Sequence, residues 1–350
     1  MNTITLTPPL LTEKHIDKKI ICIRAHRERI FNISASLRNG KLICHNYGQG
    51  GAGWTFLFGS VNKSINLFEE QLKNNPQFKN KPITVIGAGC YGLLTAITLA
   101  RAGYNVNIIA KELDAISSYK AAGFFFPRAR KCSTPEERAE FLVVGMDSYK
   151  TYLSIINGQH PFIKDGPKLL PAYYSLDTDL ELNAYISAGL IEPPVNTTID
   201  FVNGKKYPVM AYKIIFINPT IIMQQLKNTV VDLGIQITQQ EIENFDEVDA
   251  PIIFNCTGLG AKKLADDARI VPVQGHLITL KNQPIENLQY LIHVQVVQTE
   301  GNNKRDELIY YAPKNSGILG ITFIRGQDSL TANQHEFDRL IQRCQDFFGR

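Results

Sequence analysis

The sequence has no concentration of charge of one sign. Its 37 Lys and Arg residues exceed its 33 Asp and Glu residues by only four, and no run of five or more basic residues occurs. Nucleic-acid-binding proteins usually gather basic residues on one face or along one helix. The composition therefore does not suggest nucleic-acid binding, although the small positive net charge is compatible with an anionic substrate or cofactor.

The sequence also lacks the patterns of metal sites and membrane spans. None of its cysteines forms a CxxC or Cys/His pair with metal-ligand spacing. The six widely spaced cysteines are Cys22, Cys44, Cys90, Cys132, Cys256 and Cys344. We expect free thiols in a reducing cytoplasm and no metal site. Because no apolar run approaches about 18 residues and no signal-peptide core is found, we expect a cytoplasmic protein without a membrane partner.

Glycine, in contrast, is abundant in two clusters. The segment HNYGQGGAGWT at residues 45–55 contains four glycines, and VIGAGCYG at residues 85–92 contains three. Because glycine has no Cβ, the backbone there can pass very close to a ligand or to another part of the chain. Both clusters are therefore candidate ligand-binding loops.

The second cluster has the context of a dinucleotide-binding turn. An apolar strand pattern precedes it, a helical pattern follows it, and a second strand pattern comes at residues 105–110. In such a turn Gly87 permits the tight bend, Gly89 lets the backbone approach a pyrophosphate, and Gly92 allows the helix to pack on the strand. A plain strand-to-helix turn is the alternative, but the complete strand-turn-helix-strand context favours dinucleotide binding.

The second strand of this unit ends at a pair of opposite charges. Glu112 lies about twenty residues after the last glycine, where an acid commonly binds the ribose hydroxyls. Lys111 precedes it, and a cation at this place could instead bind the 2′-phosphate of NADP. Either residue could also be a solvated strand end, so the sequence leaves FAD, NAD and NADP open at this point.

The remaining sequence alternates between strand, helix and loop patterns. Residues 19–31 have the period of a half-buried strand, and Asn39-Gly40 predicts a hairpin turn before a second strand. A helix is expected to about residue 74, followed by a polar linker at 72–82. The later predictions are helices at 135–156, 218–234 and 335–348, strands and loops at 163–216, strands at 234–245, 250–258 and 276–280, and a hairpin at 309–323.

Four segments together resemble the D-amino-acid oxidase family of FAD enzymes. Besides the GxGxxG turn they are HNYGQGGAGWT at 45–55, YKAAGFFFP at 119–127 and FNCTGLGA at 254–261. The resemblance implies an α/β fold with a Rossmann-like FAD-binding domain and a mainly antiparallel β-sheet substrate domain. The implied FAD-binding domain comprises residues 29–128 and 212–270, and the implied substrate domain comprises residues 1–28, 129–211 and 271–350.

The order of these segments differs from that of the family. There the GxGxxG strand opens the chain and the HNYGxGGxG segment lies near its end, whereas here residues 1–76 come first. The resemblance thus implies a circular permutant, in which the linker near 72–82 joins the ancestral termini. Permutation is tolerated where the two ends of a chain lie close together on the surface.

The resemblance also implies cofactor contacts. Gly87, Gly89 and Gly92 would hold the pyrophosphate, and Glu112 would bind the ribose. The flavin ring would lie against Ala122, Gly123 and Phe124 and under the loop of Gly50, Gly51, Ala52, Gly53, Trp54 and Thr55. On the adenosine side the matching residues are Cys256, Thr257, Gly258 and Ile242, although Ile242 is equally well explained as a core residue.

For the substrate, the resemblance implies that Arg24 pairs with the carboxylate and that Tyr310 lies in the pocket. A bidentate guanidinium suits a carboxylate. An exposed strand arginine and a packed core tyrosine are the alternatives. Phe126 stands where a polar pocket residue often occurs in the family, and the sequence assigns no role to His26, Arg128 or Arg130.

The implied activity is oxidative deamination of a D-amino acid by hydride transfer from Cα to flavin N5. The products would be an α-keto acid, ammonia and, with oxygen as acceptor, hydrogen peroxide. Alternatives are an amino-acid dehydrogenase with another electron acceptor, a glycine-oxidase-like enzyme, and a non-catalytic FAD- or NADP-binding module. The sequence does not predict the oligomeric state.

Overall fold

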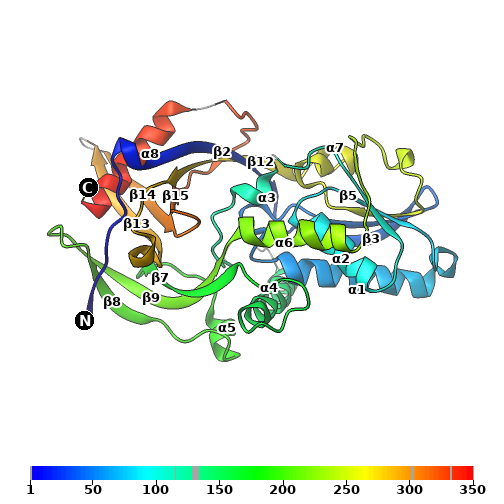
Figure 1. The fold of residues 1–350 in the computed structure, drawn as a ribbon, viewed down its shortest axis with the longest axis horizontal. Helices are drawn as coiled ribbons and strands as arrows, with labels where there is room; N and C mark the ends of the chain where they lie inside the picture. Colours follow the sequence, from blue (N-terminus) through cyan, green and yellow to red (C-terminus); the bar gives the residue numbers. More distant parts are fainter. Residues whose placement is uncertain (1, 115, 128–133, 301–302, 332, 350) are drawn as a thin grey trace.

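Two β-sheets lie side by side and divide the molecule into two halves (Figure 1). The computed structural model describes residues 2–114, 116–127, 134–300, 303–331 and 333–349. None of the helices formed by these residues has the length and apolar character needed to cross a membrane. The expected combination of a Rossmann-like sheet with a mainly antiparallel sheet is confirmed.

The first sheet has six strands, five of them parallel to one another. In spatial order the strands are β10 (Ile237–Gln239), β6 (Val106–Ala110), β5 (Ile83–Ile86), β11 (Ile252–Asn255), β4 (Lys41–Tyr47) and β3 (Asn32–Arg38). Strand β3 forms an antiparallel hairpin with β4, and its turn residues Asn39 and Gly40 have positive φ angles of 49° and 75°. The Asn-Gly turn predicted from sequence is confirmed, because both positions require this conformation.

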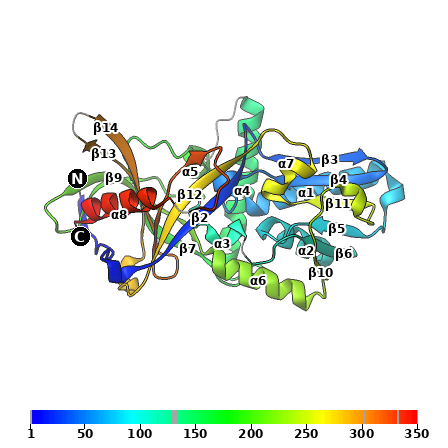
Figure 2. The ribbon, with the colours of Figure 1, turned by 90° about the horizontal axis from the view of Figure 1, so that it is seen from above.

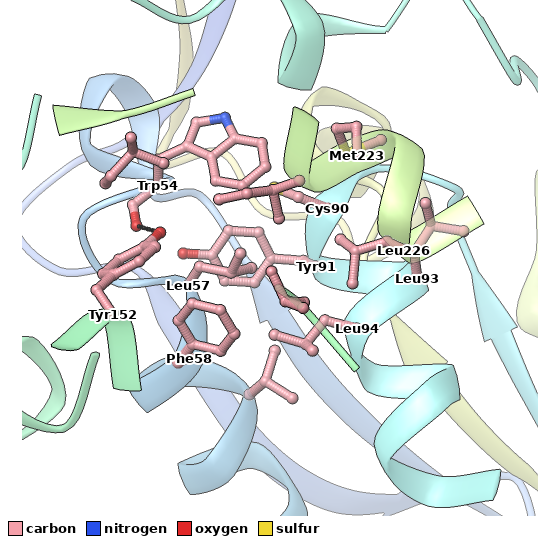
Figure 3. Close-up of a cluster of buried hydrophobic side chains, with 14 of the residues drawn as sticks. Trp54, Leu57, Phe58, Cys90, Tyr91, Leu93, Leu94, Tyr152, Met223 and Leu226 are labelled. Carbon is pink, nitrogen blue, oxygen red and sulfur yellow. Dashed lines mark hydrogen bonds between the residues drawn. The ribbon is translucent and has the colours of Figure 1, made fainter. Parts of the chain in front are cut away.

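Helices cover one face of this sheet, and a smaller cluster of apolar side chains covers the other. The helices of the first face are α1 (Leu57–Asn74), α2 (Cys90–Arg101) and α6 (Pro219–Asp232), with α4 (Pro135–Ile156) packed on α1. Figure 3 shows their apolar side chains meeting in one core, which the Tyr152 hydroxyl enters to donate to the Trp54 carbonyl at 2.6 Å. A Cβ on Gly59 would lie 2.0 Å from the Val144 carbonyl, so this glycine allows α1 and α4 to cross closely.

The second sheet has ten strands and is mainly antiparallel, with parallel pairing only for β1–β8 and β7–β13 among the described strands. Its order is β1 (Asn2–Thr5), β8 (Val195–Asp200), β9 (Lys206–Ile217), β7 (Pro167–Ser175), β13 (Leu291–Glu300), β14 (Asn303–Ala312), β15 (Ile318–Gly320), β12 (Ile270–Leu280) and β16 (Ile324–Arg325), and β2 (Ile16–Arg27) also pairs with β12. Helix α8 (Gln334–Phe348) packs on this sheet. The short helices are α3 (Ser117–Lys120), α5 (Asn183–Ser187) and α7 (Ala261–Leu264).

Several strand predictions need correction. The strand expected at 276–280 is only the end of β12, which begins at Ile270, and the strand expected at 250–258 is limited to the four residues of β11. The strand expected at 234–245 is reduced to the three residues of β10, because this edge strand pairs only with β6 and the chain then turns toward the space between the sheets. The strand expected at 19–31 begins earlier, at Ile16, and ends at Arg27. The predicted helices and the hairpin of β14 and β15 are confirmed.

Both ends of the described chain lie on the side of the molecule remote from the parallel sheet (Figures 1 and 2). Strand β1 pairs with β8 of the β8–β9 hairpin. The carbonyl of Phe347 in α8 accepts hydrogen bonds from Asn203 in the turn of this hairpin (3.2 Å) and from Tyr207 in β9 (3.0 Å). Circular permutation requires such proximity, because the present ends correspond to neighbouring residues of the unpermuted chain. The permutation and the domain limits stay predictions.

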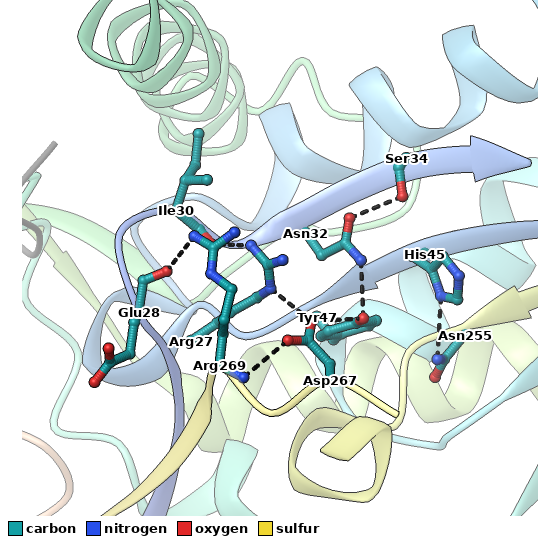
Figure 4. Close-up of polar contacts among 10 residues, drawn as sticks. All are labelled: Arg27, Glu28, Ile30, Asn32, Ser34, His45, Tyr47, Asn255, Asp267 and Arg269. Carbon is teal, nitrogen blue, oxygen red and sulfur yellow. Dashed lines mark hydrogen bonds and ion pairs between the residues drawn. The ribbon is translucent and has the colours of Figure 1, made fainter. Parts of the chain in front are cut away.

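A polar network holds the crossover from β2 to β3, where the chain passes from one sheet to the other (Figure 4). Arg27 forms an ion pair with Asp267 at 2.6 Å, and both side chains are largely buried. Tyr47 donates to the same carboxylate at 2.9 Å and accepts from Asn32 at 2.8 Å. Burial alone would raise the pKa of Asp267, but hydrogen bonds from Arg27 and Tyr47 outweigh it and lower the pKa.

Replacing Asp267 with asparagine is therefore expected to lower the free energy of unfolding by about 2–4 kcal/mol, because Arg27 loses its buried counter-charge. The matched control is Glu243→Gln, which removes an exposed carboxylate paired with Lys263 and should change stability little. Because the folded-state pKa of Asp267 is lowered, its contribution is present at neutral pH and is lost as pH falls through that pKa. Urea unfolding at several pH values measures both effects, and equal losses in the two variants would contradict the prediction.

Candidate active site

A cavity of about 960 Å³ lies between the two sheets, at the carboxyl ends of the parallel strands. Each of the five parallel strands is followed by residues that line it: 87–91 after β5, 111–112 after β6, 240–242 after β10, 256–260 after β11 and 48–54 after β4. Ligands of open α/β sheets bind in this position. The far wall comes from β2, β12 and β14 of the second sheet.

The turn after β5 requires its glycines. Gly87 has a φ of 112°, and a Cβ there would lie 2.6 Å from the Cys256 carbonyl oxygen. A Cβ on Gly92 would lie 1.8 Å from the Gly87 carbonyl oxygen, so Gly92 permits α2 to pack on the turn. Gly87 and Gly89 line the cavity, whereas Gly92 lies behind it. The turn therefore presents bare backbone and the N-terminus of α2, which suits an anion such as a pyrophosphate.

Ser118, which sequence reasoning missed, lies at this helix N-terminus. Its hydroxyl oxygen accepts from the Cys90 amide at 3.1 Å, and its carbonyl accepts from the Trp54 indole at 3.1 Å. It belongs to the four-residue helix α3, whose pattern is too short to recognise in the sequence. The Ser118 hydroxyl oxygen is thus the acceptor at the first free amide of α2, an amide that could otherwise donate to a bound anion.

The glycine-rich loop after β4 divides into a cavity wall and a support. Gly50, Gly51, Ala52, Gly53 and Trp54 line the cavity. Thr55 lies behind them, where its hydroxyl accepts from the Phe126 amide at 3.0 Å and donates to the Phe124 carbonyl at 3.3 Å. Thr55 therefore ties the loop to residues 124–126. The structure does not bring it to the cavity.

Residues 122–124 form the neighbouring wall, and backbone pairing with β9 holds them in place. Gly123 has a φ of 90°, its carbonyl accepts from the Ile217 amide at 2.7 Å, and a Cβ there would lie 1.7 Å from the Ile217 oxygen. The glycine is thus required by contact with β9 itself. Lys314 supports the same segment from the turn between β14 and β15, donating to the Ala121 carbonyl at 2.9 Å and to that of Tyr119. Burial lowers the pKa of Lys314 to about 8.

The residues expected near adenosine also line the cavity. Glu112, Ile242, Cys256, Thr257 and Gly258 all line it. Lys111 forms an exposed ion pair with Glu241 at 2.8 Å, and the hydrogen bond that Lys111 donates to this carboxylate raises the pKa of Lys111. Ile242 lines the cavity and also packs in a core cluster with Phe245, so the two interpretations of this residue are compatible.

Arg24 reaches the cavity from β2 and is 9% exposed. Its Nη1 donates to the Thr322 carbonyl at 3.1 Å, and its Cζ lies 4.8 Å from the ring centre of Phe323. Its Nη2 is buried and has no hydrogen-bond partner within the described part of the chain. A buried guanidinium nitrogen without a partner is costly, and an anionic ligand is its natural complement.

Tyr310 lies in the same wall and stacks on Phe124, with ring centres 4.4 Å apart and planes inclined by 23°. It is buried, which raises its pKa well above the usual range. His293 and Phe126 extend this aromatic wall, with ring centres 5.0 Å apart. Tyr311 points to the other sheet face and donates to the Leu288 carbonyl at 3.2 Å, as strand alternation predicts.

The basic residues without an assigned role differ in position. His26 lines the cavity and pairs through its backbone with Gln49, whereas Arg128 and Arg130 lie outside the described residues. The five described cysteines are free and buried, and Cys132 also lies outside the described residues. No cluster of three or more potential metal ligands occurs among the described side chains.

Comparison with known families decides what this cavity holds. The family described as FAD dependent oxidoreductase matches residues 82–350, from just before β5 to the end of α8. The chain belongs to this family. The match decides for FAD over the NADP alternative, and for an enzyme over a non-catalytic binding module.

Relatives of this FAD-dependent oxidoreductase are distant. The D-amino-acid oxidase of Streptomyces coelicolor is 26% identical over 208 residues, covering 59% of this chain and 61% of the relative. The D-amino-acid oxidase of Dictyostelium discoideum is 26% identical over 281 residues, covering 75% and 71%. Among solved structures, glycine oxidase from Bacillus cereus has a TM-score of 0.56 at 16% identity and covers 76% of this chain and 77% of that one. This last likeness concerns the fold alone.

The residues that line the cavity fit FAD. The Gly87 turn and Arg24 line the same cavity of about 960 Å³, so a single ligand can contact both. A side chain on Gly87 would clash with backbone, which keeps the turn bare where a pyrophosphate would lie. The loop of residues 50–54 and the segment 122–124 both line the cavity, where a flat ring system would be held against their backbone.

Proposed function

We propose that the protein oxidises a D-amino acid to an α-keto acid, ammonia and hydrogen peroxide. The observation that supports this most strongly is Arg24, whose Nη2 is buried beside the glycine-rich loop without a partner within the described residues. A Cβ on Gly51 would lie only 3.5 Å from the Arg24 Cδ, so a carboxylate bound by Arg24 would lie close to that loop. The resemblance to D-amino-acid oxidases in sequence agrees with this substrate.

In the proposed reaction, the residues of this chain bind and orient the substrate. Arg24 holds the carboxylate, and the stacked rings of Tyr310 and Phe124 exclude water and limit the orientations of the substrate. Bound FAD would supply the hydride acceptor at N5. The substrate loses a hydride from Cα and a proton from its neutral amine's nitrogen, and water hydrolyses the resulting imino acid to the keto acid and ammonia. Oxygen accepts the two electrons and two protons to form hydrogen peroxide.

Anaerobic reduction of the purified holoenzyme tests this proposal. D-Amino acids should bleach the yellow flavin absorption, whereas L-amino acids should not, and admission of air should restore the colour with one peroxide per substrate oxidised. Bleaching by glycine or sarcosine alone would favour the glycine-oxidase-like alternative. Bleaching by D-amino acids without peroxide in air would favour a dehydrogenase, and an absence of bleaching by every amine would contradict the proposal.

The aromatic wall predicts the preferred side chain. Phe124, Phe126 and Tyr310 form an apolar surface next to Arg24. Neutral apolar D-amino acids should therefore have a higher kcat/KM than D-aspartate, by about 10-fold or more, since a second carboxylate would lose hydration without gaining a matched cation. Rates of oxygen consumption with D-alanine, D-methionine and D-aspartate measure this. A preference for D-aspartate would instead assign a second cation, and His26, Lys120 and Arg325 are among the basic residues that line the cavity.

A further inference from the structure

Strand β12 passes directly against the guanidinium of Arg24 at Gly275. In the antiparallel register of β2 and β12, Gly275 pairs with Cys22 and Val273 pairs with Arg24. A Cβ built on Gly275 would lie 2.2 Å from the Arg24 Nη2, 2.6 Å from Cζ and 2.7 Å from Nη1. All three distances are far shorter than any van der Waals contact. The guanidinium therefore occupies the space that a side chain at position 275 would take.

Two neighbouring residues complete the surroundings of the guanidinium. The Phe323 ring lies 4.8 Å from Cζ, and the Thr322 carbonyl accepts from Nη1 at 3.1 Å. The Thr322 hydroxyl in turn accepts from the His276 amide at 3.0 Å and is hydrogen-bonded to His276 Nδ1 at 2.7 Å. Nη1 is thus hydrogen-bonded to Thr322, which β12 holds through His276. Nη2 has no hydrogen-bond partner within the described part of the chain, so it can donate to a ligand.

We propose that Gly275 is a positioning residue for Arg24, because the absence of its side chain sets where the carboxylate-binding group lies. Gly275 does not line the cavity and acts only through Arg24. This proposal rests on the proposed function, in which Arg24 binds the carboxylate. Guanidinium recognition of a carboxylate depends on the direction of two parallel hydrogen bonds, so a displacement of about 1 Å is costly.

The effect of a side chain at position 275 should fall on substrate binding and leave the fold intact. The atoms that a new Cβ would meet are the far end of a flexible side chain, which can move without displacing backbone. In the holoenzyme, Gly275→Ala is therefore expected to raise KM for a D-amino acid by about 10- to 100-fold. It should raise the Kd of benzoate, a carboxylate without an amine, by a similar factor in calorimetry. Flavin content and Tm should stay near those of the wild type, and Gly275→Ser should act at least as strongly.

A double-mutant cycle with Arg24→Ala separates this role from a general effect on the fold. If Gly275 acts only through Arg24, Gly275→Ala should cost nothing further once Arg24 is alanine. An equal cost in both backgrounds, or a wild-type KM and benzoate Kd in Gly275→Ala, would overturn the proposal. Failure of the proposed function looks different: Arg24→Ala alone would then keep its kcat/KM and benzoate affinity.

Discussion

Arg24→Ala is expected to lower kcat/KM for a D-amino acid by about 10²- to 10³-fold while the protein keeps its FAD. The loss of a charge-assisted, two-bond contact with the carboxylate accounts for about 3–4 kcal/mol, and each 1.4 kcal/mol corresponds to tenfold. Flavin should remain because Arg24 contacts Thr322 and Phe323 in the loop between β15 and β16, whereas the glycine turns of the first sheet surround the proposed flavin site. Steady-state kinetics and the ratio of flavin to protein absorbance measure the two effects.

Arg24→Lys is the informative companion variant. It keeps the positive charge but replaces the planar fork with a point charge, so it should recover little of the lost kcat/KM. Lysine also cannot donate to the Thr322 carbonyl and to a bidentate carboxylate in the same plane. Full recovery by lysine would mean that only net charge matters at this position. Near-normal kcat/KM in Arg24→Ala would place the carboxylate site elsewhere.

Deletion of residues 1–80 is expected to abolish folding and FAD binding together. The deletion removes β4, which lies between β11 and β3 inside the parallel sheet, and leaves one edge of β11 unpaired. It also removes α1 from the core, the loop of residues 48–54 from the cavity, and Arg24. Circular dichroism and flavin retention on gel filtration test this. A deletion variant that remains folded and yellow would show that the first 80 residues are a separate domain.

The reordered chain should behave in the opposite way. A protein that begins near Asn80, runs to Arg350 and continues through a short linker into residues 1–76 keeps the described tertiary contacts and moves only the chain break. We expect it to fold, turn yellow and oxidise the same substrates. Two observations support this: β1 and the end of α8 meet at the β8–β9 hairpin, and the family match begins at residue 82. A reordered chain that fails to fold would count against the permutation.

Features set by neighbouring residues could be predicted from the sequence. The Asn39-Gly40 turn and the bend at Gly87 each depend on local backbone conformation, which a few residues specify. The helix at 135–156 also has the predicted limits, with Pro135 in its first turn and the Thr134 side chain accepting from the Glu137 amide.

Features that depend on distant segments could not be predicted in this way. Gly275 matters because of Arg24, which lies on another strand, and Lys314 matters because it supports backbone near residue 120. Thr55 belongs to a recognisable motif, yet its hydroxyl forms hydrogen bonds with the backbone of residues 124 and 126. No local sequence pattern predicts these contacts. The shortness of β10 likewise follows from its position at the sheet edge.

The position of β4 in the parallel sheet has a consequence for how the protein folds during synthesis. Its partner strand β11 is made 210 residues later, from Leu42 to Ile252, and the paired residues Arg24 of β2 and Val273 of β12 are 249 residues apart. Apart from the β3–β4 hairpin, the first strands to leave the ribosome therefore lack their sheet partners until most of the chain has been translated. Contacts so far apart in sequence slow folding. Residues 1–76 should consequently be the part of the nascent chain that depends most on chaperones. In the reordered chain these residues are made last, so they would need chaperones only at the end of synthesis.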